Sequence, residues 1–264
     1  MIFNGAVYST KAEDSRIYKP LSNGRFICGI ADGHGGCAAA RLCKEHISTL
    51  DDVCNPTSLF REINDKCLAL ECNSGASLTV CFVNDLEVQC ANVGDSHALV
   101  VTPTSHYWIS ESHRLQDNVN DRTLLSAQVG YAQCDGKSSG PPRLYPGGLM
   151  CSRSVGDADC PFISCKPSVC HTTLDADDIV IVASDGLWDA MPLHKICKVA
   201  RETRCAETLL RTHKQHFSDD TSVIMVSTKT AKKPYGVLFR VSSNGSISSD
   251  DDDPPIRRVF KVTL

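Results

Sequence analysis

FICGIADGHGG, residues 26–36, is an apolar run followed at once by an acid, a histidine and several glycines. The apolar part, residues 26–31, is typical of a buried strand, and Asp32-Gly33 ends it. The same pattern returns where the β-branched run at residues 178–184 leads into Asp185-Gly186. An acid-glycine pair alone indicates a turn. Its repetition after two buried strands predicts a sheet with acidic groups at its strand ends.

Further strands and helices are expected around this stretch. Residues 77–83 and 86–93 are apolar runs on either side of Asn84-Asp85, which predicts a hairpin. Strands are also expected at residues 97–102 and 222–227, and helices at residues 36–48, 57–70, 122–129 and 194–213. Helices inserted between antiparallel strands favour an α+β layered fold, with sheets in the middle and helices on their outer faces.

Four aspartates flank the expected strands. Asp32, Asp95 and Asp185 follow the carboxyl ends of strands, and Asp219 precedes the amino end of another. In an antiparallel sheet, the end of one strand lies beside the start of its neighbour, so these carboxylates can converge on one edge. Converging carboxylates repel one another and need cations. Hard oxygen ligands of this kind favour Mg²⁺ or Mn²⁺.

The amino-acid composition argues against several classes of function. The 264 residues suit one large domain or two small ones, with 42% hydrophobic and 22% charged residues. The net charge of −4 and the lack of a Lys/Arg run argue against a nucleic-acid or anionic-membrane binder. No signal peptide and no membrane span are expected. The expected location is the cytoplasm, with nuclear entry left open.

The fifteen cysteines are scattered and form no C-x-x-C pair. Without a secretory signal, we interpret them as reduced, mostly buried thiols. A zinc site and a redox switch are the alternatives, but the spacing of zinc ligands is absent.

At this point the chain resembles a known family, the metal-dependent protein phosphatases of the type 2C class. The resemblance covers about residues 5–228 and includes motifs in the family's order. These motifs are Glu13-Asp14, Asp32-Gly33-His34-Gly35-Gly36, Ser74-Gly75-Ala76-Ser77, Asn92-Val93-Gly94-Asp95-Ser96, the segments 148–157 and 183–189, and Asp219-Asp220-Thr221-Ser222-Val223. The fold that the resemblance implies is a central antiparallel β-sandwich flanked on both faces by pairs of α-helices.

The resemblance implies a metal centre. Asp32 would bridge two ions, and the backbone carbonyl of Gly33 would bind one of them. Asp185 and Asp219 would bind the other ion. Two further pairs of acids have implied roles at the edge of this centre: Glu13 and Asp14 would hold metal-bound waters, and Asp95 and Asp189 would help to bind a third, weaker ion.

The implied activity is hydrolysis of phosphoserine and phosphothreonine in proteins. The resemblance implies two or three Mg²⁺ or Mn²⁺ ions. A water that bridges two of these ions would attack phosphorus, and His34 would protonate the leaving alkoxide. A lone histidine would be interpreted as a capping or core residue, but the motif around His34 favours the catalytic role. The expected partners are phosphoprotein substrates, and the expected state is a monomer.

The chain divides into a catalytic domain at residues 1–230 and a C-terminal extension at residues 231–264. The extension contains a Ser/Asp-rich acidic segment of the kind expected in flexible linkers. Ser248 and Ser249 precede four aspartates, a context for acid-directed kinases or simply a solvated loop. Residues 256–264 could add a short strand.

The chain departs from the family pattern at two places. The family's arginine that grips the substrate phosphate is replaced by Ser9, and nearby Lys11 offers only a weak, single-point contact. The family's acid before the next histidine is replaced as well, giving Ser112-His113, and we interpret His113 as structural.

Three other functions stay open. A pseudophosphatase would keep the fold and bind partners without turnover. The missing arginine favours it slightly, whereas the retained acids argue against it. A thiol-dependent protein is suggested by the cysteine count alone, and activity that survives thiol blocking but not chelation would eliminate it. A phosphatase of small metabolites is also compatible with the missing arginine.

Restoring the arginine tests how the chain binds phosphate. Ser9→Arg should lower the KM for a small phosphate ester, because a guanidinium offers the planar two-pronged contact that Lys11 lacks. Steady-state kinetics with p-nitrophenyl phosphate measure the effect. An unchanged KM would contradict this interpretation.

Overall fold

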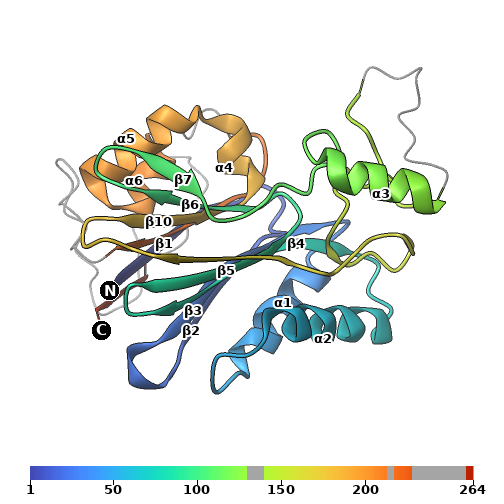
Figure 1. Ribbon diagram of the computed structural model, residues 1–264, viewed down its shortest axis with the longest axis horizontal. Helices are drawn as coiled ribbons and strands as arrows, with labels where there is room; N and C mark the ends of the chain where they lie inside the picture. Colours follow the sequence, from blue (N-terminus) through green and yellow to red (C-terminus); the bar gives the residue numbers. More distant parts are fainter. Residues whose placement is uncertain (130–139, 213–216, 228–259, 264) are drawn as a thin grey trace, which may run out of the picture.

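Two antiparallel sheets packed face to face form the centre of the computed structural model (Figure 1). The structure describes residues 1–129, 140–212, 217–227 and 260–263. The first sheet, in spatial order, consists of β12 (Phe260–Thr263), β1 (Ile2–Tyr8), β11 (Thr221–Ser227), β10 (Ile179–Ala183), β6 (His97–Val101) and β7 (His106–Trp108). The second consists of β2 (Ser15–Pro20), β3 (Phe26–His34), β4 (Gly75–Asn84), β5 (Glu87–Val93) and β9 (Ser168–Thr173), and β8 (Val155–Gly156) pairs with β4.

Helices cover the outer faces of both sheets (Figure 1). The helices α1 (Ala38–Ser48) and α2 (Pro56–Ala69) cover the second sheet. The helices α4 (Asp185–Ala190), α5 (Leu193–Thr203) and α6 (Ala206–Arg211) cover the first. The helix α3 (Val119–Val129) lies to one side of these layers, and a single 3₁₀ turn, η1, spans Ser22–Gly24. The predicted α+β sandwich of four layers is confirmed.

Strands buried on both faces explain the nearly continuous apolar runs of the sequence. In β10, Ile179 and Ile181 face the helices, whereas Val180 and Val182 face the other sheet. The alternation follows from the two-residue period of a strand. Each sheet therefore packs against helices on one side and against its partner sheet on the other, which fixes the register of every central strand.

The helix expected at residues 194–213 is interrupted, which is a correction to the sequence-based prediction. Arg204 has a left-handed backbone with φ 52°, and it separates α5 from α6. The side chain of Asn4 holds this break from both sides. Its Nδ2 donates to the carbonyl of Arg204 at 3.0 Å, and its Oδ1 accepts from the amide of Ala206 at 2.7 Å. Residue 213 lies outside the described residues.

Two acids sit differently from the expected turns. Asp32 and His34 lie within β3, because the pairing of β3 with β4 continues to His34 opposite Gly75. Asp185 is the first residue of α4, where the sequence suggested a turn. One acid-glycine pair therefore lies inside a strand and the other begins a helix, and neither forms the expected turn.

The described cysteines are all free thiols. Cys28, Cys81, Cys90 and Cys170 lie side by side in register across β3, β4, β5 and β9. The first three are buried between the sheets, where they act as small apolar side chains.

The end of the chain returns to the first sheet, since β12 pairs with β1. This agrees with the expected strand at residues 256–264. The acidic segment with Ser248 and Ser249 lies outside the described residues, and the domain boundary at residue 230 stays a prediction. None of the described helices is both long and apolar enough to cross a bilayer.

The core beneath α2 can be tested by truncation. Phe60 is 0% exposed, so Phe60→Ala should lower the free energy of unfolding by about 3–5 kcal/mol through lost burial and a cavity. Leu70, just past the same helix and 65% exposed, is the matched control, and Leu70→Ala should change it by about 0.5 kcal/mol or less. Urea unfolding followed by circular dichroism measures both. Equal losses would contradict the described packing.

Candidate active site

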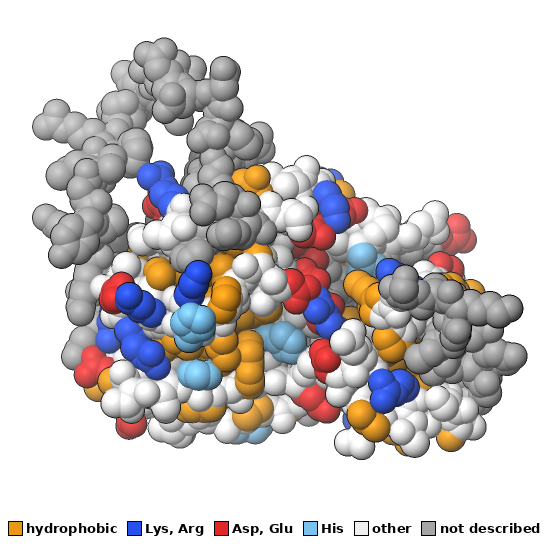
Figure 2. Space-filling model, turned by 90° about the horizontal axis from the view of Figure 1, so that it is seen from above, with side chains coloured by type: hydrophobic (Ala, Val, Ile, Leu, Met, Phe, Trp, Pro, Cys, Tyr) orange, Lys and Arg blue, Asp and Glu red, His pale blue; other side chains and the backbone are white. Residues whose placement is uncertain are grey.

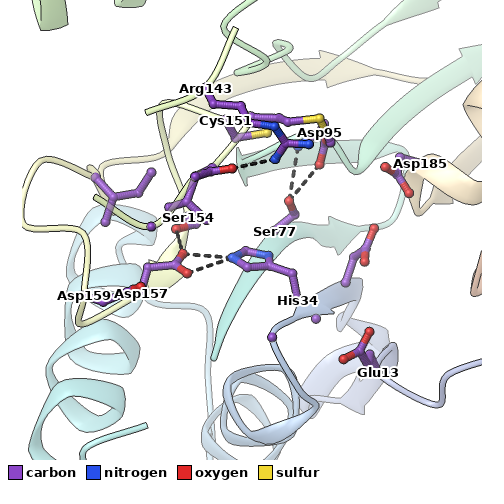
Figure 3. A pocket seen from close by; sticks show the side chains of 18 of the residues that line it. Glu13, His34, Ser77, Asp95, Arg143, Cys151, Ser154, Asp157, Asp159 and Asp185 are labelled. Atoms are coloured by element: carbon purple, nitrogen blue, oxygen red, sulfur yellow. Dashed lines mark hydrogen bonds and ion pairs between the residues drawn. The ribbon is translucent and has the colours of Figure 1, made fainter. Parts of the chain in front are cut away.

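A cleft of about 430 Å³ opens where strand ends from both sheets meet, and acidic side chains line it (Figure 3). Asp32 comes from β3, Asp95 follows β5, and Asp185 begins α4. Figure 2 shows red acidic side chains gathered near the middle of the face seen from above, with blue basic side chains beside them. The remaining lining includes Lys11, Glu13, Gly33, His34, Ser77, Arg143, Cys151, Ser154, Asp157, Asp159 and Asp219.

Asp32, Asp95 and Asp185 form a tight acidic group. One carboxylate oxygen from each lies within 4.8 Å of the others. Burial, together with the neighbouring acids, raises the pKa of Asp32 well above its usual range. Burial and the charge of Asp95 raise the pKa of Asp185 to about 7. Both shifts express the cost of burying carboxylates close to one another, and at Asp185 the charge of Arg114 offsets only part of that cost.

The donors around this group fit a hard divalent ion. All the clustered ligands are carboxylate oxygens, which Mg²⁺ and Mn²⁺ prefer. Asp14 lies beside Asp32, and its Oδ1 is buried without a hydrogen-bond partner among the described residues. Burial raises the pKa of Asp14 to about 6. A buried acceptor without a donor beside an acidic cluster is the environment that a bound cation, with its water, would satisfy.

Glu13 and Asp219, the other predicted ligands, line the same cleft. Glu13 Oε1 accepts from the amide of Gly36 at 2.9 Å. Asp219 forms an ion pair with Lys11 Nζ at 2.9 Å, and both side chains are about half exposed. At Gly33 the backbone passes so close to the Glu13 carbonyl that a Cβ would lie 2.7 Å from that oxygen. The glycine is therefore required for the close approach of these two segments.

Asp220, to which the sequence analysis assigned no role of its own, organises the loop with Lys11 and Glu13. Its carboxylate accepts from the amides of Lys11 at 2.8 Å and Glu13 at 2.7 Å. Burial opposes its ionisation, but these amides outweigh burial and lower the pKa of Asp220 to about 2. Its position directly after Asp219 was the only sequence signal.

His34 faces the cleft with its ring held by Asp157, which the sequence analysis placed in the motif at residues 148–157 without a role (Figure 3). Nε2 lies 2.8 Å from Asp157 Oδ1, and Ser154 Oγ also donates to Asp157. Gly75 makes room for this carboxylate, because any Cβ there would collide with it. Burial alone would lower the pKa of His34, but the hydrogen bond and charge of Asp157 outweigh it and the pKa is raised.

Arg114 is a residue that the sequence analysis missed. Its Nε donates to Asp95 Oδ2 at 2.7 Å, and Nη2 donates to Asp185 Oδ2 at 2.9 Å. Both Nη atoms also contact the two oxygens of Asp189, at 2.9 and 2.7 Å. Burial opposes ionisation of Asp95, but the guanidinium outweighs burial and lowers its pKa. The sequence offered no signal for these contacts beyond a basic residue after His113.

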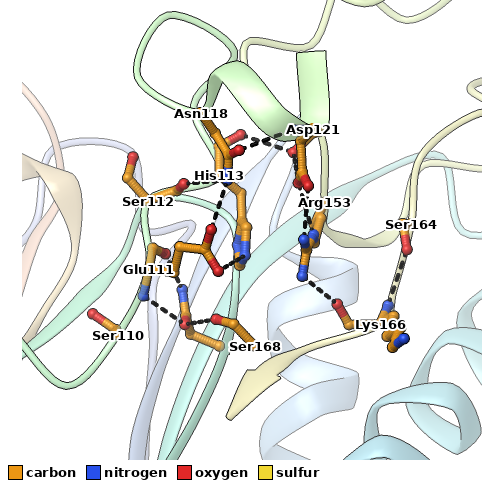
Figure 4. Close-up of polar contacts among 12 residues, drawn as sticks. Ser110, Glu111, Ser112, His113, Asn118, Asp121, Arg153, Ser164, Lys166 and Ser168 are labelled. Atoms are coloured by element: carbon orange, nitrogen blue, oxygen red, sulfur yellow. Dashed lines mark hydrogen bonds and ion pairs between the residues drawn. The ribbon is translucent and has the colours of Figure 1, made fainter. Parts of the chain in front are cut away.

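A polar network beside the cleft holds the segment around His113 (Figure 4). The buried His113 accepts from the Gly94 amide through Nδ1 at 3.1 Å, and its carbonyl accepts from the Ser152 amide at 2.8 Å. Burial lowers the pKa of His113 to about 3. Arg153 and Asp121 form an ion pair at 2.7 Å in the same network. This environment agrees with the structural role expected for His113.

Comparisons with known proteins give one consistent result. The family model described as Protein phosphatase 2C matches residues 7–230. A probable protein phosphatase 2C 33 of Oryza sativa subsp. japonica is 31% identical over 227 residues, covering 74% of this chain and 52% of that protein. A probable protein phosphatase 2C 12 of Arabidopsis thaliana is 30% identical over 236 residues, covering 79% and 55%. The chain thus spans about half the length of these relatives.

Solved structures share the fold. A serine-threonine phosphatase 2C of Toxoplasma gondii superposes with a TM-score of 0.68 at 16% identity, covering 85% of this chain and 94% of that one. A serine/threonine phosphatase of S. agalactiae superposes with a TM-score of 0.64 at 17% identity, covering 86% and 100%. At these identities the likeness establishes the two-sheet architecture.

The contact between His34 and Asp157 predicts a titration. Asp157→Asn should lower the pKa of His34, because it removes the charge that outweighs burial. Imidazole NMR signals followed against pH in the chelated protein measure the shift. Asp159→Asn, which removes another acid of the same cleft, is the matched control and should leave the pKa of His34 unchanged. If both variants titrate like the unmodified chain, the hydrogen bond does not set the protonation of His34.

Proposed function

Because this chain belongs to the protein phosphatase 2C family, we propose that it hydrolyses phosphoserine and phosphothreonine in proteins, using two or three divalent metal ions. The observation that carries the proposal is the group of carboxylate oxygens from Asp32, Asp95 and Asp185 within 4.8 Å of one another. Three acids from three separate elements meet in an open cleft, beside a histidine whose pKa is raised. This combination suits phosphoryl transfer from a protein substrate to water.

The proposed metal centre uses acids from both sheets. Asp32, the carbonyl of Gly33, Asp185 and Asp219 would hold the ions, which we propose to be Mg²⁺ or Mn²⁺. Glu13 and Asp14 would hold and orient water at the same edge. Such ions, when bound, lower the pKa of a water molecule and offset charge on the phosphoryl oxygens. Asp95 and Asp189, the acids expected at a third ion, are both engaged by Arg114.

His34 is the proposed general acid. Asp157 holds Nε2 and stabilises the protonated ring, while Nδ1 has no hydrogen-bond partner among the described residues. The ring therefore offers a proton at Nδ1 to the oxygen of the departing serine or threonine. Because a serine alkoxide is a poor leaving group, a positioned acid of this kind contributes about 10²–10⁴-fold to the rate.

Phosphate binding is proposed to be weak in the ground state. Ser9 is exposed and too short to reach a phosphate as an arginine would. Lys11 supplies a point charge at the cleft, but its Nζ is shared with Asp219. Arg143, on the rim of the cleft, donates to the Gly148 carbonyl at 2.6 Å and adds a further positive group. We propose phosphoproteins as substrates, a monomeric chain, and the cytoplasm as its compartment, with nuclear entry left open.

Hydrolysis assays test the function directly. Purified chain should turn over p-nitrophenyl phosphate and a phosphothreonine peptide with Mn²⁺ or Mg²⁺ and lose this activity with chelator. Asp32→Asn should reduce turnover by roughly 10²–10³-fold or more, because it removes a charged ligand at the centre of the cluster. Asp52→Asn is the matched control, since the side chain of Asp52 is 62% exposed and pairs with Arg25.

The alternative function is decided by the same assay. A folded chain without turnover under any metal would refute the phosphatase and favour a pseudophosphatase that binds phosphopeptides. Turnover that survives chelation would also refute the metal-dependent mechanism. Turnover of p-nitrophenyl phosphate without turnover of the peptide would point to small phosphate esters as substrates.

A further inference from the structure

Arg114 makes a denser set of ionic contacts than an ordinary surface arginine. Its single guanidinium contacts Asp95, Asp185 and Asp189, at distances between 2.7 and 2.9 Å. The contact with Asp189 uses both carboxylate oxygens, which is the forked geometry that an arginine, and not a lysine, can supply. The Arg114 side chain is only 25% exposed, so its pairs with Asp95 and Asp185 are partly shielded from water, whereas Asp189 is 58% exposed.

The backbone around Arg114 holds the guanidinium in this position. The amide of His113 donates to the Gly94 carbonyl at 3.1 Å, and the amide of Leu115 donates to the Met150 carbonyl at 2.8 Å. Arg114 itself forms a β-bridge with Cys151. Contacts on both sides of Arg114 thus attach it to the loop that carries Asp95 and to the segment lining the cleft. Arg114 is a fixed part of the site.

The oxygens of the acidic side chains are unequally occupied. Both oxygens of Asp95 accept from protein groups, Oδ1 from Ser77 at 2.9 Å and Oδ2 from Arg114. Both oxygens of Asp189 accept from Arg114. In contrast, the hydrogen bonds of the described residues leave Asp185 Oδ1 without a donor. The acids therefore divide into a pair already satisfied by the protein, Asp95 with Asp189, and acids that keep oxygens for an exchangeable ion.

The residue at position 112 also argues against a divalent ion beside Asp95 and Asp189. Ser112 stands where an additional acid was expected from the family resemblance, and its hydroxyl contacts Asp117 at 3.3 Å. This end of the site therefore has one carboxylate fewer and one guanidinium close to the remaining ones. A further divalent ion here would have to displace a fixed cation from both acids and would meet its repulsion at short range.

From these contacts we infer that Arg114 is the resident cation of the Asp95–Asp189 end of the site and excludes a divalent ion from it. The chain would then bind two exchangeable ions, at the end formed by Asp32, Asp185 and Asp219. This inference rests on the proposed metal-dependent function and specifies its ion count. Arg114 is a positioning residue, since it acts through the acids that it contacts.

Counting bound Mn²⁺ tests the inference without an activity assay. Equilibrium dialysis and the electron paramagnetic resonance of free Mn²⁺ should show that Arg114→Gln binds one more ion per chain than the unmodified protein. Arg153→Gln is the matched control, because it removes an arginine that pairs with Asp121 outside the acidic cluster. It should leave the count unchanged.

Asp189 supplies a second test, and its first comparison does not depend on the folding of an arginine variant. Asp189→Asn in the unmodified background should leave the Mn²⁺ count unchanged, because Arg114 already occupies that carboxylate. In the Arg114→Gln background it should abolish the additional ion. Thermal unfolding adds an independent readout. In chelator, Arg114→Gln should lower the Tm by about 2–8 °C, and saturating Mn²⁺ should restore more stability to it than to the unmodified chain.

The outcomes separate the inference from the proposed function. An unmodified chain that binds Mn²⁺, with a folded Arg114→Gln variant that binds no more, would overturn the inference and leave the metal-dependent function standing. Loss of an ion from Asp189→Asn alone would overturn it as well. An unmodified, folded chain that binds no Mn²⁺ would refute the proposed function, and the inference with it.

Discussion

Mutual repulsion among buried carboxylates is the constraint on which this structure depends. Asp32, Asp95 and Asp185 are held within a few ångströms of one another, where each raises the cost of ionising its neighbours. Such a group persists only if the surrounding fold is rigid enough to prevent its separation. The antiparallel registers of β3, β4 and β5, and of β10 with β6 and β11, supply that rigidity, because every central strand is packed on both faces. The packing of the two sheets therefore keeps these negatively charged side chains close together.

Positively charged side chains of the protein offset part of this repulsion, and the proposed metal ions would offset the rest. Arg114 compensates one end of the cluster, and Lys11 compensates Asp219 at the mouth of the cleft. Backbone amides do the same for Asp220, whose low pKa shows how strongly they favour its charge. Asp32 and Asp14 keep raised pKa values even though Ser184 donates to Asp14 at 3.0 Å, and these two acids mark the part of the site where an added cation would gain most. A bound ion is therefore expected beside the acids that the positive groups of the protein compensate least.

Much of the fold could be predicted from the sequence, because strand and helix periods are local properties. The alternation in β10 and the apolar side of α2 required only neighbouring residues. The break at Arg204 could not be predicted, since it depends on Asn4, which lies 200 residues away in the chain. The site divides in the same way. The acids, Asp157 included, stand in recognisable motifs, whereas the pairing of His34 with Asp157 and of Arg114 with Asp95 is defined by contacts across the fold. The separation of 123 residues between His34 and Asp157 leaves no periodic signal.

The placement of β1 has a consequence for how the chain is made. β1 is synthesised before the other described strands, yet in the first sheet it lies between β11 and β12, which come after all the others in the sequence. At cellular rates of roughly 5–20 residues per second, β1 must wait on the order of 10–40 s on the ribosome for its partners. The second sheet needs only residues 15–93 to form β2 to β5, so most of it can assemble much earlier. Throughout that interval the apolar face that β3 and β4 will share with the first sheet has no permanent cover. The partly synthesised chain therefore exposes apolar surface, and with it a risk of aggregation, until the first sheet closes over that face.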